Sequence, residues 1–197
     1  RHRVSVLHGS PIVVSVERSQ SPQAPLVNYA SVNGFQVVRL EAVTAFCAGD
    51  GLDPSVTSAC PCGNFGGVGR GCANSVQPLG ALLGWSGAPD PDTLVLDVAG
   101  TPATATCVYL QGDGITDLPF GDGVRCAGGA LIRLGSATNL NGNGSYPGPG
   151  DPALSTRGAV VPGSGGVRAY QVYYRNAAAA FCPPALVNIT NGLRVVW

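Results

Sequence analysis

Apolar and polar residues alternate along most of the chain, and no stretch sustains a helical period. In residues 168–176, Tyr170, Val172 and Tyr174 fall on one face while Gln171 and Tyr173 fall on the other, as a half-buried strand requires. Similar patterns predict strands at residues 2–7, 11–17, 34–46, 80–85, 92–98, 103–112, 129–135, 157–161, 168–176, 186–190 and 193–197. We therefore predict an all-β fold, an antiparallel β-sandwich of jelly-roll-like type.

The segments between these strands are rich in Gly, Asn and Pro. Two of them, residues 49–78 and 138–155, are long enough that we expect them to be tied down or functional. The tripeptide GDG recurs at 49–51, 112–114 and 121–123, and each copy predicts a turn. QSPQAP separates a β-patterned N-terminal extension, residues 1–20, from a single domain at residues 21–197.

Composition narrows the possible partners. Charged residues make up 11% of the 197 residues, and 11 Arg balance 11 acidic residues, so we expect neither nucleic acid nor an anionic membrane as a partner. No apolar run approaches the roughly 20 residues that cross a bilayer, so no membrane span is predicted. The absence of Lys and Met suggests a processed, mature product whose signal peptide has been removed, and hence an extracellular location.

The stretch CPCGNFGGVGRGC, residues 60–72, allows three interpretations. A phosphate-binding loop needs a Lys, which the chain lacks. A structural zinc site usually has two pairs of Cys or His ligands spaced near C-x2-C, whereas here one and then nine residues separate the cysteines and the His residues are remote. A secreted chain with seven cysteines favours disulfides instead. We expect Cys60 and Cys62 to take different partners, because one Pro between them leaves little freedom to join them.

Several motifs occur in a fixed order: FCAGDG, CPCGN, GRGCANS, FGDGVRCAGGALIRL, YQVYYRNAAAAFC and NITNGLRVVW. Together they resemble the cysteine-rich domain at the C-terminal end of many large secreted proteins of environmental bacteria. The resemblance covers about residues 44 to 197 and implies a secreted β domain with no assigned catalysis.

The motifs also lead to a disulfide prediction. We expect disulfides from Cys47, Cys60, Cys62 and Cys72 among themselves, with Cys60 and Cys62 each bonded to one of the outer two, and a bond from Cys126 to Cys182. Cys107 stands where the resemblance implies an apolar strand residue, and we expect a buried free thiol there.

Candidate catalytic groups are sparse. Both His residues, at positions 2 and 8, lie in the extension, and no GxSxG motif is present. A carboxylate pair for glycoside hydrolysis would have to come from Asp50, Asp53, Asp113, Asp117 and Asp122, which are more typical of turns. Calcium is a weaker alternative for residues 112–123 and for the asparagines of 139–143, neither of which matches an EF-hand. We predict no enzyme, no cofactor and no metal.

Two functions remain open. The first is a filament or surface-assembly subunit, a homopolymer in which a donated strand carrying Val4, Val6, Ile12, Val14 and Val16 pairs with a neighbouring copy; docking of that strand in its own domain is equally compatible. The second is a carbohydrate-binding module whose stacking rings come from Tyr109, Tyr146, Tyr173, Trp85 and Trp197. The sequons at Asn143 and Asn188 predict glycans, with Asn143 the better site.

Overall fold

The computed structural model describes residues 41–197, of which Ala42–Trp197 form one compact unit. The predicted N-terminal extension, its assembly strand and the boundary after residue 20 lie outside the described residues. The strands are β1 (Val43–Phe46), β2 (Leu82–Ser86), β3 (Val95–Ala99), β4 (Thr106–Phe120), β5 (Gly123–Thr138), β6 (Gly144–Tyr146), β7 (Val167–Arg175), β8 (Val187–Ile189) and β9 (Gly192–Val196), with one helical turn, α1 (Leu154–Arg157).

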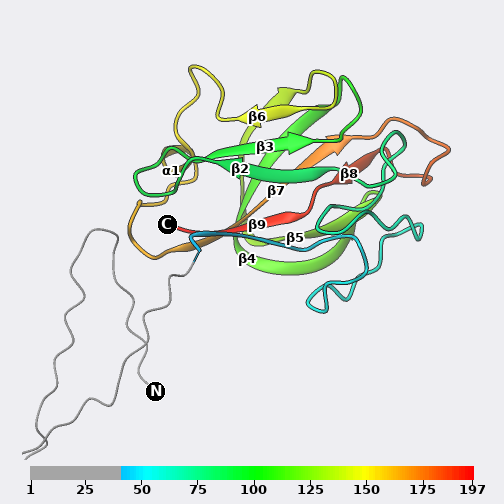
Figure 1. Ribbon diagram of the computed structural model, residues 1–197, viewed down its shortest axis with the longest axis horizontal. Coiled ribbons are helices and arrows are strands. Elements are labelled where there is room, and N and C mark those ends of the chain that lie inside the picture. The colour runs from blue at the N-terminus through cyan, green and yellow to red at the C-terminus, as the bar shows by residue number, and fades with distance from the viewer. Residues whose placement is uncertain (1–40) are drawn as a thin grey trace, which may run out of the picture. The chain divides into compact units, whose positions relative to one another are not determined.

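The strands form two antiparallel sheets, which confirms the predicted fold class. The large sheet has the order β1-β9-β7-β4-β5, with β8 also paired to β7, and the small sheet has the order β2-β3-β6 (Figure 1). The two sheets have six and three strands, whereas a jelly roll has eight strands in all, so the predicted jelly-roll type does not match. No described helix is long and apolar enough to cross a bilayer.

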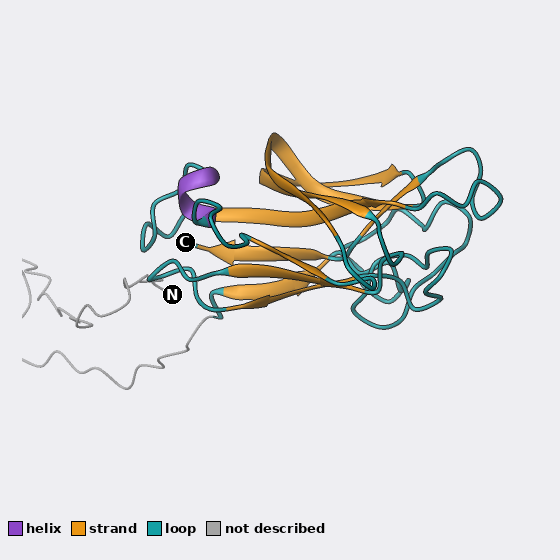
Figure 2. Ribbon diagram, turned by 90° about the horizontal axis from the view of Figure 1, so that it is seen from above, coloured by secondary structure: helices purple, strands orange, loops and turns teal. Residues whose placement is uncertain are grey.

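The main core lies between the two sheets, which form separate layers in Figure 2. Leu83 and Leu96 enter it from the small sheet, and Tyr109, Tyr170 and Tyr174 from the large one, all fully or almost fully buried. The alternation in residues 168–176 therefore predicts the inner face of β7 correctly.

The other face of β7 is covered as well, which the alternation does not predict. Gln171 is 0% exposed because the loop after β1 and the first half of β5 fold over the sheet. A second, smaller core lies there, made of Cys47, Cys60, Cys72, Val124 and Cys126.

Three predicted elements differ from the structure. The GDG at 112–114 is not a turn but part of β4, where a register shift occurs between Gly112 and Gly114. A Cβ on Gly112 would stand 2.4 Å from the carbonyl oxygen of Gly128, so glycine here allows two strands to approach closely. The strand expected at 157–161 is instead the end of α1 and a turn, and the expected loop 138–155 contains β6.

Candidate functional site

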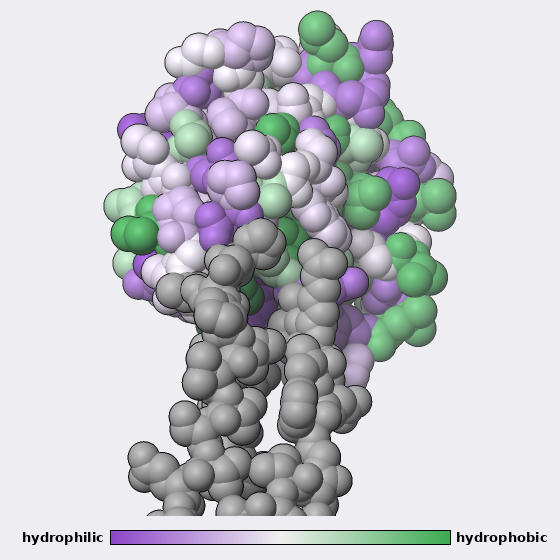
Figure 3. Space-filling view, turned by 60° about the vertical axis from the view of Figure 1, so that its left-hand side comes forward, coloured by the Kyte–Doolittle hydropathy of each residue, from purple (hydrophilic) through white to green (hydrophobic). Residues whose placement is uncertain are grey.

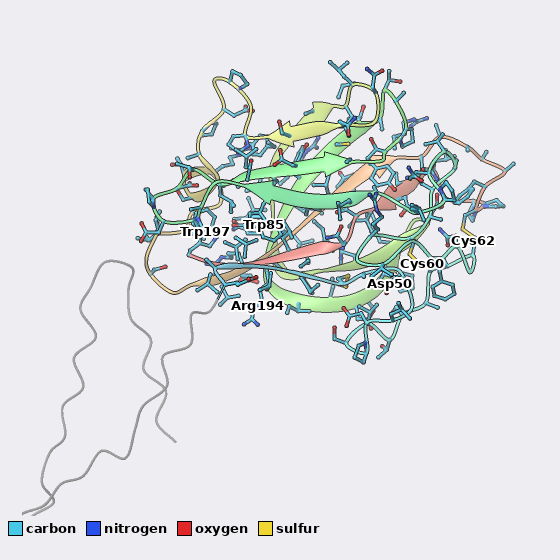
Figure 4. All side chains as sticks on the ribbon, in the orientation of Figure 1. Asp50, Cys60, Cys62, Trp85, Arg194 and Trp197 are labelled. Atoms are coloured by element: carbon cyan, nitrogen blue, oxygen red, sulfur yellow. A yellow bond between two sulfur atoms is a disulfide. The ribbon has the colours of Figure 1, made fainter. Side chains whose placement is uncertain are left out.

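The disulfides fix the loop that follows β1. Cys47 bonds Cys126, Cys60 bonds Cys72 and Cys62 bonds Cys182, with Cα atoms 6.1, 5.9 and 5.9 Å apart. Of the expected pairings, Cys60 does bond one of the outer two cysteines, Cys72. The others are wrong, because Cys62 bonds neither of the outer two and Cys126 does not bond Cys182. The reason is topological, because the first half of β5 carries Cys126 onto the end of β1, which leaves Cys62 and Cys182 to meet across the loops. Figure 4 shows Cys60 and Cys62 at the end of the domain away from Trp85 and Trp197.

Cys107 is the free cysteine of the described residues. It lies in β4 with its side chain in the main core, 0% exposed. Burial raises the pKa of this thiol to about 12, so it stays protonated and unreactive at neutral pH.

A chain of polar groups, of which Asn176 and Asp122 are buried and Ser75 is half-buried, joins the cysteine-rich loop to the hairpin turn between β4 and β5. The Ser75 hydroxyl donates to Oδ1 of Asn176 over 2.5 Å, and the Ser75 backbone N–H donates to the same oxygen over 3.3 Å. Asn176 Nδ2 donates to Oδ2 of Asp122 over 2.6 Å. Asn176 is 0% and Asp122 is 1% exposed. Burial raises the pKa of the Asp122 carboxyl, against a smaller opposing effect of the Asn176 hydrogen bond, and its Oδ1 has no hydrogen-bond partner among the described residues.

Further asparagines bind the backbone of the same loop. Asn64 Nδ2 donates to the carbonyls of Ala73 and Asp122 over 2.8 and 2.9 Å, and Asn188 Nδ2 donates to Ala73 over 2.9 Å. Asn74 Nδ2 donates to the Tyr174 hydroxyl over 3.0 Å. The motifs CPCGN, GRGCANS and NITNG thus meet at one place. Sequence reasoning missed this site, although an Asn in each of these motifs was the available signal.

The two sequons differ in access. Asn188 is 0% exposed and its amide is held inside the network, so the folded domain offers no access for the glycan expected there. Asn143 is exposed, on the loop that leads into β6. Its amide donates only to the nearby carbonyl of Asn141, over 3.0 Å.

The carboxylates considered for catalysis or calcium are used singly. Asp53 accepts from the backbone and hydroxyl of Ser55, and these bonds hold its pKa below the usual value. Asp113 accepts from the backbone of Ala130, and Asp117 from that of Thr57. Asp50 likewise accepts from the backbone N–H groups of Leu52 and Gly69. Within residues 41–197 no three acidic, His or Cys side chains come together as a metal site would need.

The rings expected to bind sugars do not form a platform. Tyr109, Tyr146 and Trp197 are buried, and half-buried Tyr173 packs edge-on against Phe120 with centroids 5.5 Å apart. Only Trp85 of the five is well exposed, at 41%. A shallow groove of about 480 Å³ follows the outer face of the small sheet, lined by Asp97, Asn143 and Ser145 among others, but by no aromatic ring.

The visible face in Figure 3 carries apolar residues in small groups among polar ones, outside the part that grey atoms cover. Such scattered groups are normal on a protein surface and do not mark a docking area. The edges of the sheets are therefore the more informative features of the surface.

The edge of the small sheet is blocked at β2. The side chain of Asn191 accepts from the N–H of Leu83 over 2.7 Å and donates to its carbonyl over 3.0 Å. These two bonds replace those that an adjacent strand would make at this point.

The edge of the large sheet at β1 has no such cap from any residue between 41 and 197. The Val196 N–H donates to the Ala42 carbonyl. Because every second residue of an antiparallel strand bonds the same neighbour, the backbone groups of Thr44 and Phe46 also face β9. The N–H and C=O groups of Val43 and Ala45 then point away from the sheet. No strand within residues 41–197 pairs with this side of β1.

Comparison of the chain with protein-family models, with curated proteins and with solved structures finds no match.

Proposed function

We propose that this protein is a secreted structural subunit that assembles outside the cell by strand donation between copies. Residues 4–16 of one copy, with Val4, Val6, Ile12, Val14 and Val16 on the donated strand, pair along the outer edge of β1 in the next copy. The observation that carries the proposal is the β1 edge, which the part of the chain that the structure describes leaves uncapped, in contrast to the capped edge of β2.

The chemistry of the domain supports a structural role. Three disulfides suit an oxidising compartment outside the cell. Asp50, Asp53, Asp113 and Asp117 each hold a loop or strand through its backbone, and the Cys107 thiol is buried in the core. These groups stabilise the fold instead of forming a reactive centre. The carbohydrate-binding alternative has less support, since Trp85 is the only well-exposed ring of its five.

The β1 edge offers modest binding energy by itself. Four outward backbone groups, those of Val43 and Ala45, would contribute about 0.5–1.5 kcal/mol for each hydrogen bond formed. Each apolar side chain that the donated strand buries adds about 1.5–3 kcal/mol. A donor with five such residues thus supplies most of the affinity through its side chains, while the edge fixes their register.

The proposal is tested by one change on each side of the joint. Deletion of residues 1–20 removes the donor, and Ala45→Pro removes an outward N–H without touching the β1–β9 bonds. Ala45→Ser is the matched control, because it keeps the N–H at the same exposed position. Negative-stain microscopy and light scattering should show fibres for the full chain and for the serine variant, and monomers for the other two.

Three results would contradict the proposal. Fibres of normal length from the deletion protein would exclude residues 1–20 as the donor. A monomeric full chain whose residues 4–16 are protected from hydrogen exchange would place the strand in its own domain. If instead Ala45→Pro assembles normally with its disulfides intact, β1 is not the acceptor.

A further inference from the structure

The hydrogen bonds of Asn176 bring together three groups that can react with one another, from Ser75, Asn176 and Asp122. A hydroxyl, a carboxamide and a carboxyl follow one another in a line, and the last two are almost completely buried. A buried carboxyl with one oxygen unsatisfied is costly to the fold. The same three groups are the components of an acyl transfer: a nucleophile, an acyl donor and an acid.

The orientation of the Asn176 amide follows from its partners. A backbone N–H can only donate, so the Asn176 atom that receives the Ser75 N–H is the carbonyl oxygen. The NH₂ group therefore faces Asp122. The nitrogen that would leave in an acyl transfer thus lies against the group that would protonate it.

The nucleophile is also close enough. The Ser75 hydroxyl oxygen lies 2.5 Å from the carbonyl oxygen of Asn176. Because a C=O bond is about 1.2 Å long, the hydroxyl oxygen is at most about 3.7 Å from the carbonyl carbon. This approaches the separation at which a held pair of groups reacts. The Ser75 N–H is placed to stabilise negative charge on the carbonyl oxygen during attack.

We infer that Ser75 and Asn176 become joined by an intramolecular ester that the protein forms itself. The Ser75 Oγ bonds to Cγ of Asn176, the Cγ–Nδ2 bond breaks, and the nitrogen leaves as ammonia. In its neutral form Asp122 gives its proton to the leaving nitrogen, and the proton that the Ser75 hydroxyl loses replaces it on the carboxyl, so the nitrogen gains one proton in all and Asp122 ends as it began. No electrons are gained or lost, and no other reactant is needed.

The environment of Asp122 suits this role. Burial favours its neutral form, which is the form that can donate a proton to the leaving nitrogen. Burial of Asn176 keeps bulk water from the acyl carbon, so water competes poorly with the hydroxyl. The cross-link would join positions 101 residues apart, from the cysteine-rich loop to the end of β7. Formation of this cross-link does not depend on the strand donation proposed above.

Peptide mapping of the full chain tests the inference. After reduction and alkylation, cleavage at arginines places Ser75 in the peptide of residues 71–125 and Asn176 in that of residues 176–194. The ester predicts one joined species, about 17 Da lighter than the sum of the two linear peptides because ammonia has been lost. Hydroxylamine should separate the two peptides, as it cleaves esters. Cyclisation of the Asn191-Gly192 site to a succinimide also loses ammonia, but it does not join two peptides.

Three variants assign the roles. Ser75→Ala should give only separate peptides, whereas Ser58→Ala, which removes another partly buried loop serine, should give the joined species as the wild type does. Asp122→Asn cannot supply a proton, so the joined fraction in freshly purified protein should fall below about one tenth, since such an acid contributes about 100-fold or more in rate. Circular dichroism and intact disulfides check that each variant is folded.

Separate wild-type peptides with unmodified Ser75 and Asn176 would overturn the inference, and so would joined peptides in Ser75→Ala. A full yield of the joined species in Asp122→Asn would overturn the role of the carboxyl. Failure of assembly with the cross-link present would concern strand donation only, so the two proposals fail separately.

Discussion

Gln171 holds the second core to the large sheet, and replacing it by Ala should destabilise the domain strongly. Its Oε1 accepts from the N–H groups of Cys126 and Ala127 over 2.6 and 2.8 Å. Its Nε2 donates to the carbonyls of Val124 and Thr190 over 3.1 and 2.9 Å. One side chain therefore satisfies backbone groups of β5 and of the link between β8 and β9, at a position that is 0% exposed.

The size of the effect follows from these four partners. Gln171→Ala leaves four backbone groups without a bond in a buried place, and each unsatisfied group costs about 1–3 kcal/mol. Taking the lower value for each, the loss in free energy of unfolding is at least about 4 kcal/mol. Since typical domains are stable by about 5–15 kcal/mol, this variant should be close to unfolding at room temperature.

Urea unfolding with the disulfides intact, followed by circular dichroism, measures this loss. Gln171→Leu keeps a similar volume and should lose nearly as much as the Ala variant, because hydrogen bonds and not volume carry the effect. Gln77→Ala is the matched control, since its amide accepts only one exposed backbone bond, from Leu79, and it should change stability by under about 0.5 kcal/mol. A loss below about 1 kcal/mol for Gln171→Ala, or full stability for Gln171→Leu, would refute this reasoning.

Three further predictions concern the thiol, the disulfides and the sequons. Cys107 should give no colour with a thiol reagent at pH 8 in the folded protein and one equivalent after unfolding without reductant, because burial raises its pKa to about 12; reaction before unfolding would contradict this. Changing Cys62 and Cys182 to Ser should lower the free energy of unfolding in urea by about 5 kcal/mol, and changing Cys60 and Cys72 to Ser by about 3 kcal/mol, because the first disulfide closes a loop of 120 residues and the second a loop of 12. Equal losses would contradict the chain-entropy argument. If the protein is produced in a host that modifies sequons, glycopeptide mapping should find sugar on Asn143 and none on Asn188, and the reverse would contradict the burial of Asn188.

The strands were predictable wherever one face packs in the core and the other is polar. Residues 168–176 are the clearest case, because a period of two requires only local information. The β4–β5 hairpin was not predictable over its full length, since GDG at 112–114 has the composition of a turn. What keeps it in the strand is the close approach of Gly112 to Gly128, a contact between residues far apart in the sequence.

The cysteines illustrate the same limit. That six of the seven form disulfides could be anticipated from the secreted character of the chain, but their pairing depends on which strand crosses which loop. Only the bond of Cys60 with Cys72, which closes a loop of 12 residues, followed from local arrangement. The asparagine network was missed for the same reason, because its members lie in separate motifs until the fold brings them together.

The position of the disulfides bears on how a strand-donated assembly would carry load. The described unit begins beside its own end, since Ala42 accepts from Val196, so tension arriving through the N-terminal segment would act first on the pairing of β1 with β9. That pairing covers four residues and would be peeled one bond at a time. Peeling stops at Cys47, directly after β1, because its bond to Cys126 ties the chain to β5. The cysteine-rich loop, closed further by its other disulfides and by the Ser75–Asn176 link, would then be shielded from the load, and only β1 would need to re-form when the tension is released.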